Sequence, residues 1–585
     1  MGLSVLVLEK DARIYPLPRA IHFDGEVMRI FQSVGLRAPV EAISRPGLKG
    51  MHFVNAAGET LLIRGGVTAH GPHGCANNHY FHQPELEGVL REGVARFSQV
   101  KVCLQVEVQQ VTDQADHVDL QVLDLTTGHA RTWQARYLVG CDGARSLVRK
   151  TIGATMTDLG LHQPWLVFDA LLKPGAHGLP DHTVQHCDPA RPMTYCNVTN
   201  NRRRWEIMLM PGDDPAKLVQ PDTLWSLVGR WVTPSTADIE RAVIYTFHSV
   251  IAQGWRRGRL LLAGDAAHQT PPFLGQGMCA AIRDVSNLAW KLHAVLQGRA
   301  DDALLDTYES ERSPHVHAFI ELAVRLGDII QTTDPQQATE RDRRFQSGQP
   351  EIFEFPSPRL GPGLCSDGGI PVGQPFPQPV LSDGRWLDEH TGHRFGVIAS
   401  AALLDGVSPT TRTNWAQWGA AILSDEEPTL RAWLDRHGAR AAVIRPRLRG
   451  CPARTTPMKR SRNSVCARTS GRAARSWLRP TPRRSRRRER RSMGRASRPA
   501  ISASVPRTVR SKISSCPARS CPWQKPRPNQ ASSSLPATML GTPCSSRRIC
   551  TSPARPRVTI SPSICAPRLP STSSIFSSMD SASRR

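Results

Sequence analysis

The chain has 585 residues, enough for two or three domains with sizeable hydrophobic cores. Its net charge of +25 suggests a nucleic-acid-binding protein, but the charge is unevenly distributed. Residues 447–585 contain 32 Lys and Arg against 2 Asp and Glu, whereas residues 1–446 carry a net charge of −5. The composition of the first 446 residues is therefore that of a mildly acidic globular protein and gives no indication of nucleic-acid binding.

Cysteine usage and hydropathy indicate the compartment. The seven cysteines of residues 1–446 are scattered, mostly in apolar contexts, which is typical of reduced thiols rather than of a disulfide framework. No apolar run reaches about 18 residues, so no transmembrane helix is expected. Glu9, Lys10 and Asp11 come too early for a signal peptide. We predict a cytoplasmic protein with no membrane partner and no metal site.

Apolar periodicity predicts the elements of the first half. In chain order they are a strand at Ser4–Glu9, helices at Glu26–Val34 and Gln83–Phe97, strands at Val100–Val111 and Val118–Leu125, a buried strand at Tyr137–Gly143, and sheet strands within Leu166–Trp205 and Ala242–Val250. Two of these strands, the first and the one at Tyr137–Gly143, end near an acidic residue, Glu9 and Asp142.

The second half begins with a short buried strand before Asp265, followed by a helix at Cys279–Leu296 and a long helix at Asp301–Leu326. Proline-rich turns from Glu354 to Pro379 indicate a linker. A smaller α/β unit is predicted from Leu381 onward. Its elements are strands near Phe395–Ile398 and Ala441–Ile444 and a helix near Thr429–His437.

After Pro446 the composition changes abruptly to Arg, Ser, Pro and Cys, without apolar periodicity. One interpretation is a solvated basic arm that binds nucleic acid. The other is an out-of-frame translation of GC-rich DNA, which yields the same composition. We favour the second because the α/β unit stops in the middle of an element, and we predict a disordered tail without a nucleic-acid partner.

The segment Arg259–Met278 is the most informative motif. A buried strand ends at Asp265, a glycine-rich turn follows, and a helix then begins, so backbone N–H groups and a carboxylate face the same place. This pattern suits a cofactor that carries hydroxyl groups and negative charge. At this length and order it resembles the second flavin-binding signature of the FAD-dependent aromatic hydroxylases.

That resemblance implies cofactor contacts throughout the motif. Asp265 would bind a ribityl hydroxyl, Pro272 would shape the turn over the flavin ring, and the helix N-terminus would face the pyrimidine edge. The cofactor-binding residues predicted here are Gly264, Asp265, Pro272, Gly275, Gly277, Met278 and Cys279. His268 is predicted to be a packing residue, and Tyr308–Pro314 a structural helix.

Upstream segments match the same family. Glu9 would accept hydrogen bonds from the adenosine ribose, although an isolated strand-end acid is more often a solvated charge. Arg19, in Tyr15–Asp24, resembles the arginine that reaches the FAD pyrophosphate. Gln83 matches a position that contacts the flavin, with a simple helix-start role as the alternative. Asp142 and Gly143 resemble the Asp-Gly motif associated with FAD and reduced nicotinamide, with Ser146 capping the helix behind them.

The resemblance extends from Leu3 to Pro446 and is closest to the 3-(3-hydroxyphenyl)propionate hydroxylases. It implies an α/β fold: a Rossmann-type FAD-binding domain with an inserted mixed β-sheet substrate domain, a partial thioredoxin-like C-terminal unit and a disordered basic tail. The predicted boundaries are 1–160 and 251–350 for FAD binding, 161–250 for the substrate sheet, 351–446 for the linker and C-terminal unit, and 447–585 for the tail. The Gly-x-Gly-x-x-Gly loop and first strand expected before Ser4 are absent, so we expect weak FAD binding and an unpaired edge on Ser4–Leu8.

The family's chemistry is hydroxylation of a phenol ring ortho to its hydroxyl, with FAD, NADH or NADPH, and O2. The expected substrate is 3-(3-hydroxyphenyl)propionate. Another phenol or a polyketide, or an inactive product of a disrupted gene, remains open, and so does a homodimer. No motif identifies the catalytic base. Tyr195 and His186 are candidates for it, each with a packing or surface role as the alternative, and Arg204 is a candidate partner for a substrate carboxylate.

Overall fold

The computed structural model describes residues 2–65, 69–346, 351–353, 358–364, 371–446, 450–454 and 573–574. Chain contacts divide the protein into one unit of residues 1–480 and 570–585 and a second of residues 481–569. Every described residue belongs to the first unit. Most of the predicted tail therefore lies outside the described residues.

The first strand, β1 (Val5–Glu9), lies parallel to β7 (Val100–Leu104). On its other side it pairs at Val5 and Leu6 with the two-residue strand β25 (Ser573–Ser574). The single strand predicted at Val100–Val111 is broken at Gln105, whose φ of 58° lies in the left-handed region. Because of that break, β8 (Val106–Asp113) leaves β7 and forms an antiparallel sheet with β9 (Val118–Asp124) and β10 (Ala130–Ala135).

A short parallel pair of strands precedes the motifs that contain Asp142 and Asp265. Strand β11 (Leu138–Gly140) lies beside β18 (Leu260–Leu262), which also pairs with β17 (Arg256–Arg257). Helices α4 (Leu147–Ile152), α7 (Gly277–Leu296) and α8 (Thr307–Ile330) share a large apolar core with these strands. The predicted helix at Asp301–Leu326 is a 3-10 turn, η3 (Asp302–Asp306), followed by α8.

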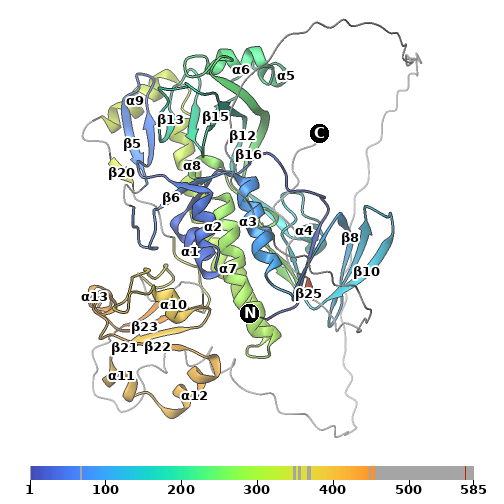
Figure 1. Cartoon of the computed structure of the whole chain (residues 1–585), viewed down its shortest axis with the longest axis vertical. Coiled ribbons are helices and arrows are strands. Elements are labelled where there is room, and N and C mark those ends of the chain that lie inside the picture. The colour runs from blue at the N-terminus through green and yellow to red at the C-terminus, as the bar shows by residue number, and fades with distance from the viewer. Residues whose placement is uncertain are drawn as a thin grey trace, which may run out of the picture. The chain divides into compact units, whose positions relative to one another are not determined.

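The largest sheet has the strand order β19-β16-β12-β15-β14-β13-β4-β5-β20 (Figure 1). Its two longest strands, β12 (Thr155–Leu172) and β16 (Ala237–Gln253), run antiparallel to each other. The remaining strands are β4 (Met51–Val54), β5 (Thr60–Arg64), β13 (Thr183–His186), β14 (Met193–Asn197), β15 (Arg202–Met208), β19 (His268–Gln269) and β20 (Glu351–Phe353). The sheet thus extends beyond 161–250, because β4 and β5 come from the N-terminal part of the chain.

The segment between β1 and β7 forms a small region of its own. Strand β6 (Asn78–Phe81) pairs with β2 (His22–Asp24) and β3 (Ser44–Pro46). The helices of this region are α1 (Gly25–Ser33), α2 (Arg37–Ala42) and α3 (Gln83–Ala95). Asp24 caps α1 by accepting a hydrogen bond from the N–H of Val27. Two further helices, α5 (Pro215–Leu218) and α6 (Pro221–Val228), precede β16.

The C-terminal elements form a sheet of order β22-β21-β23-β24. Its strands are β21 (Gly396–Ala399), β22 (Ala421–Ser424), β23 (Ala439–Ile444) and β24 (Gly450–Arg454). Its helices are α10 (Leu387–Thr391), α11 (Ala401–Asp405), α12 (Pro409–Trp418) and α13 (Pro428–Arg436), and α9 (Pro335–Phe345) precedes the linker. Because β24 pairs antiparallel with β23, the sheet continues past the boundary predicted at Pro446.

Among the described residues, no helix is both long enough and apolar enough to span a membrane. The same residues contain no cluster of His, Cys, Asp and Glu side chains suited to a metal ion.

Candidate functional site

The segment after β18 turns sharply twice before α7 begins. The 3-10 turns η1 (Gly264–Ala266) and η2 (Pro272–Leu274) are bounded by glycines with a φ of 63°, a conformation that costs other residues about 1 kcal/mol or more. A Cβ at Gly275 would lie 2.8 Å from Nδ1 of His22. Glycine is therefore required at position 275 both for the backbone conformation and for the close approach of β2.

A buried carboxylate fixes this turn. Asp284, on α7, accepts hydrogen bonds from the backbone N–H of Gly264 at 3.1 Å and from Nε of Arg312 at 2.9 Å, and its Oδ2 lies 2.7 Å from Nε2 of His268. Burial would raise the pKa of Asp284, but His268 and Arg312 outweigh it and hold that pKa below its ordinary value. His268 also packs against Trp255. His268 is thus packed and hydrogen-bonded inside the turn, as expected of a packing residue.

The ring end of the predicted FAD site lies around the start of α7. Asp265 is half-buried, and its carboxylate receives no hydrogen bond within the described part of the chain. Burial raises its pKa, against the opposing charges of His268 and Arg19. A Cβ added at Gly277 would meet nothing within 4 Å, and the first-turn N–H groups at Gly277, Met278 and Cys279 have no acceptor within the helix.

The buried side chain that precedes this turn is also incompletely paired. Oε1 of Gln276 accepts from Arg283 at 3.0 Å, whereas its Nε2 has no hydrogen-bond partner among the described residues. Open space, free N–H groups and an unpaired carboxylate together fit the flavin end of FAD. Asp265 and the backbone of Gly277, Met278 and Cys279 would hold it.

Arg19 is presented by an anchored backbone. Oε1 of Gln83, at the start of α3, accepts from the N–H groups of Arg19 and Ala20 at 2.9 and 2.8 Å. The Arg19 guanidinium lies over the ring of Tyr15, 5.0 Å from its centroid, and its charge acts on Asp265. Burial lowers the pKa of Arg19. Gln83 therefore starts α3 and positions a predicted cofactor residue, and its own contact with the flavin stays a prediction.

The Asp-Gly motif is tied to the same turn. Asp142 accepts from Oγ of Ser146 at 2.5 Å and from the N–H of Val148 at 3.1 Å, so it caps α4 together with Ser146. Gly143 has a φ of 73°. Arg149 then donates to the carbonyl of Ala266 at 2.9 Å, which joins this motif to the turn at Asp265.

Glu9 does not lie on the same sheet as the Asp142 and Asp265 motifs. It ends β1, is buried, and accepts a hydrogen bond from the N–H of Asp11 at 2.9 Å. Strands β1 and β18 belong to separate sheets. The structure therefore groups the residues predicted for the ring end, from Asp142 to Cys279, with Arg19 and Gln83, and it places Glu9 on a different sheet.

One face of the large sheet looks toward the predicted flavin residues. Side chains directly opposite each other on neighbouring strands lie on the same face of a sheet. The cross-strand register gives three rows on this face: a first row of Arg241, Asp169, Arg204 and Cys196, a middle row of Val243, Val167, Glu206, Thr194 and Gln185, and a third row of Tyr245, Trp165 and Met208.

The outer rows contact the two flavin-site segments. In the first row, Arg204 donates to the carbonyls of Pro18 and Arg19 at 2.6 and 2.7 Å. In the third row, Trp165 packs against Phe273 of η2, with ring centroids 5.5 Å apart. The middle row therefore lies between the backbone that carries Arg19 and the turn that carries Pro272.

The opposite face of the sheet is a hydrophobic core. Tyr195 packs against Trp205 and donates its hydroxyl to the carbonyl of Pro180 at 2.9 Å, and His186 packs against Trp231. This core also includes Leu218 of α5 and Leu224 of α6. Strand alternation thus turns Tyr195 and His186 away from the face that contacts the flavin-site segments, and both take the packing role that was their alternative.

The prediction for Arg204 also needs correction. Arg204 is buried, with 2% of the residue exposed. Its guanidinium pairs with both oxygens of Asp169, at 2.7 and 3.0 Å, and also donates to the carbonyls of Pro18 and Arg19. These contacts occupy each of its nitrogens. Arg204 therefore fixes the backbone at Arg19 and is unsuited to a substrate carboxylate.

Sequence reasoning missed the polar residues of the middle row. Glu206 is mostly buried, with its side chain 12% exposed, and burial raises its pKa against the charge of Arg204. Beside it, Oγ1 of Thr194 donates to Oε1 of Gln185 at 2.5 Å. The signal was present in Arg204–Ile207, where charged residues alternate with Trp205 and Ile207. This is the pattern of a strand with one polar and one apolar face.

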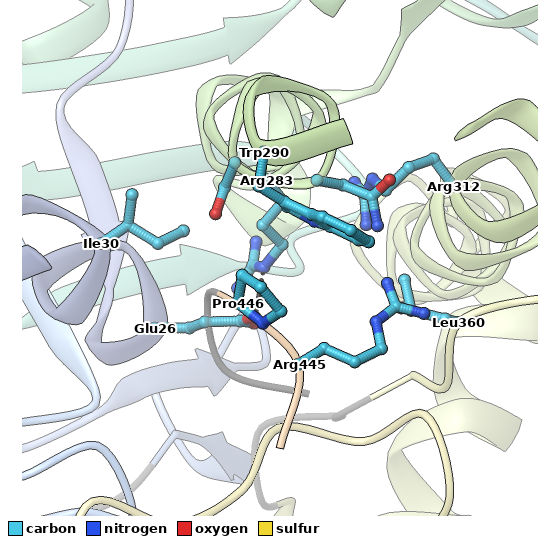
Figure 2. A pocket seen from close by; sticks show the side chains of 10 residues that line it. Glu26, Ile30, Arg283, Trp290, Arg312, Leu360, Arg445 and Pro446 are labelled. Carbon is cyan, nitrogen blue, oxygen red and sulfur yellow. Dashed lines mark hydrogen bonds and ion pairs between the residues drawn. The ribbon is translucent and has the colours of Figure 1, made fainter. Parts of the chain in front are cut away.

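A separate pocket of about 310 Å³, including its open mouth, lies between α1, α7, Leu360 and the residues before position 447 (Figure 2). Its arginines already have carboxylate partners. Arg283 binds Asp24 and Glu26, Arg312 binds Asp284, and Arg445 binds Glu311. None of the predicted cofactor residues lines this pocket. Because each of these arginines is neutralised by a carboxylate, we interpret the pocket as part of the packing interface between α7 and the C-terminal elements.

The sequence of this chain is similar to those of known proteins. Residues 1–323 match the family model described as "FAD binding domain". A probable NADH-specific resorcinol 4-hydroxylase of Rhodococcus jostii (strain RHA1) is 36% identical over 473 residues, covering 76% of this chain and 86% of the relative. A 3-(3-hydroxy-phenyl)propionate/3-hydroxycinnamic acid hydroxylase of Shigella sonnei (strain Ss046) is 32% identical over 486 residues, with the same coverage of both chains.

Solved structures show the same fold. The flavin-dependent monooxygenase PieE, in complex with FAD and substrate, superposes with a TM-score of 0.64 at 20% identity over 76% of this chain and 91% of that one. Aklavinone-11 hydroxylase, with FAD and aklavinone, also gives a TM-score of 0.64, at 21% identity over 77% of this chain and 90% of that one.

Proposed function

Because the chain belongs to the FAD-dependent aromatic hydroxylases, we propose that it hydroxylates a phenolic ring ortho to the hydroxyl group, with NADH or NADPH and O2 as co-substrates. The observation that supports this most strongly is the polar middle row of the large sheet. It lies between the segment that carries Arg19 and the turn that carries Pro272. A ring placed there would lie beside the predicted flavin residues.

In this proposal the residues of the chain bind the cofactor and orient the substrate. When bound, FAD supplies the redox chemistry, which is hydride uptake from the nicotinamide and activation of O2. With FAD bound, the first turn of α7 would direct its N–H groups toward negative charge at the pyrimidine edge, and the half-buried Asp265 would accept hydrogen bonds from ribityl hydroxyls. Trp165 and Phe273 form an apolar boundary at one side of the middle row and exclude water there.

Two substrates follow from the relatives' names. The first is 3-(3-hydroxyphenyl)propionate, which the sequence resemblance also indicates, with the 2,3-dihydroxy compound as product. The second is resorcinol. Both present a phenolic hydroxyl, but only the first carries a carboxylate at neutral pH.

The test is turnover by the purified full-length chain with FAD in excess. NADH and NADPH oxidation and O2 consumption are recorded with and without each phenol, and products are separated by chromatography. We expect oxidation that depends on FAD and is stimulated by a phenol, with formation of a product containing one more hydroxyl group. Oxidation that no phenol stimulates, together with no hydroxylated product, would contradict the proposal.

A further inference from the structure

A buried cation of the large sheet holds the flavin-site turn. Arg64, the last residue of β5, is 3% exposed, and both its Nη1 and its Nη2 donate to the carbonyl of Leu274 at 3.3 Å. The cross-strand register aligns Arg64 with Met51 and Thr183. Because Thr183 lies two residues before Gln185, Arg64 is on the same sheet face as the middle row. Its guanidinium therefore reaches from this face to the end of η2, just before α7 begins.

The next carbonyl of the turn meets a neutral side chain. Nδ1 of His22 lies 3.4 Å from the carbonyl oxygen of Gly275, and its Nε2 lies 3.1 Å from Oδ1 of Asn78. Burial and the charge of Arg64 lower the pKa of His22, so its ring is uncharged at neutral pH. Burial also lowers the pKa of Arg64 to about 10, which leaves the guanidinium charged. Of these two side chains, Arg64 is the one that brings charge to the turn.

That charge completes a balance around the start of α7. Arg283, on α7, donates to Oδ2 of Asp24 at 2.5 Å and to Oε2 of Glu26 at 2.7 Å, so one guanidinium faces two carboxylates. Arg64 is the second cation, and the charge of Asp24 acts on it. All four charges act on Cys279, in the first turn of α7. Without Arg64, this buried group would have one cation for two anions.

The balance matters most when the flavin is reduced. Reduced FAD carries more negative charge on its ring than oxidised FAD, and the proposed function places the pyrimidine edge at the first turn of α7. In a buried site of low effective dielectric, one unit of nearby charge changes the affinity for an anion by about tenfold or more. A cation behind the turn thus favours the reduced cofactor, and an uncompensated carboxylate there opposes it.

We infer that Arg64 is a positioning residue for the cofactor: it fixes the Leu274 carbonyl and supplies the charge that makes the start of α7 bind reduced FAD in preference to oxidised FAD. The inference rests on the proposed function and adds a residue that tunes the cofactor without touching the substrate. It assigns a role to a buried arginine of the sheet that no flavin motif contains.

The test compares the affinities of the purified full-length chain for oxidised and reduced FAD. The dissociation constant of oxidised FAD is measured by quenching of flavin fluorescence. The midpoint potential of bound FAD is measured without O2, with protein in excess, against a dye of known potential. Together with the potential of free FAD, these values give the ratio of the two affinities. A purely structural loss weakens both affinities equally and leaves that ratio unchanged.

Three variants separate charge from structure. Arg64→Gln keeps a donor for the Leu274 carbonyl but removes the charge, so the preference for reduced FAD should fall at least about tenfold. That change lowers a two-electron midpoint potential by about 30 mV. Arg64→Lys keeps the charge and should hold the ratio within about threefold. Glu26→Gln removes one of the two carboxylates instead and should shift the ratio toward reduced FAD, so it tests the charge balance even if a change at Arg64 prevents folding.

Arg341→Gln is the matched control. Arg341 is 2% exposed and donates to the carbonyls of Ile329 and Cys187 at 3.0 and 2.8 Å, so it is also a buried arginine that holds backbone oxygens. It lies on α9 and contacts none of the predicted cofactor residues among the described hydrogen bonds. Its substitution should leave the ratio of affinities unchanged.

The inference is overturned if Arg64→Gln leaves the ratio unchanged, if Arg341→Gln lowers it as much, or if Glu26→Gln fails to shift it toward reduced FAD. Each of these results leaves the proposed hydroxylase function intact, because the unmodified chain still binds FAD. An unmodified chain without saturable FAD binding would instead overturn the proposed function and this inference with it.

Discussion

Replacing Asp284 by Asn tests whether one buried carboxylate holds the flavin-site turn in place. The residue is 0% exposed and receives donors from three directions: the N–H of Gly264, Nε2 of His268 and Nε of Arg312. Asparagine preserves the volume but removes the charge. Because asparagine offers one acceptor oxygen in place of two, an NH2 group would face either Nε of Arg312 or the N–H of Gly264 and Nε2 of His268, and Arg312, 1% exposed, would lose its counter-charge. Breaking a buried ion pair in this way costs roughly 3–5 kcal/mol.

The assay is urea denaturation of the purified chain, followed by tryptophan fluorescence, with the free energy of unfolding obtained by linear extrapolation. Asp328→Asn is the control, since Asp328 lies on α8 and its carboxylate has no ion-pair partner among the described residues. That substitution should change stability by less than about 0.5 kcal/mol. A loss below about 1 kcal/mol for Asp284→Asn would refute the view that Asp284 anchors the turn.

Two other predictions concern the same core. Gly275→Ala places a Cβ 2.8 Å from Nδ1 of His22, on a residue whose φ is positive. We therefore expect the free energy of unfolding to fall by about 1–2 kcal/mol. An unchanged urea midpoint would show that the turn tolerates a side chain. Lys291 and Arg445 outweigh burial and hold the pKa of Glu311 below its ordinary value of 4.5. The stabilisation by Glu311 is therefore complete above about pH 4.5 and is lost as the pH falls further, and Glu311→Gln should show a shallower loss of stability in acid. If the unmodified protein and Glu311→Gln lost the same amount of stability in acid, the acid sensitivity would not come from Glu311.

The sequence predicted best where a motif is contiguous. The strand ending before Asp265, the glycine turn and the helix that follows were all expected, because each feature is set by neighbouring residues. Strand β1 and helices α1 and α3 also agree with their predicted ranges to within one or two residues. The family resemblance, the FAD-dependent enzyme class and the mixed α/β fold are confirmed by the comparisons.

Features that depend on distant residues were not predictable in this way. The single strand expected from Val100 breaks at Gln105 because its two halves find different partners, β1 and β9. Asp284 and Arg312 look like ordinary charged residues on helices until the fold brings them to Gly264. Tyr195 and His186 were chosen for their chemistry, whereas strand alternation decides which side chains face the flavin-site segments. Applied to β15, that alternation would have indicated Glu206 instead.

The central claim is that the start of α7 holds the ring end of FAD. Gly277→Ala tests it most directly, because a Cβ there meets nothing within 4 Å and should leave the stability of the flavin-free protein intact. FAD binding is measured by quenching of flavin fluorescence over a wide range of protein concentration. We predict saturable binding that Gly277→Ala weakens at least about tenfold, as the added methyl group displaces the ring from the helix N-terminus. Equal FAD affinity in the two proteins, or no saturable binding in either, would contradict the account.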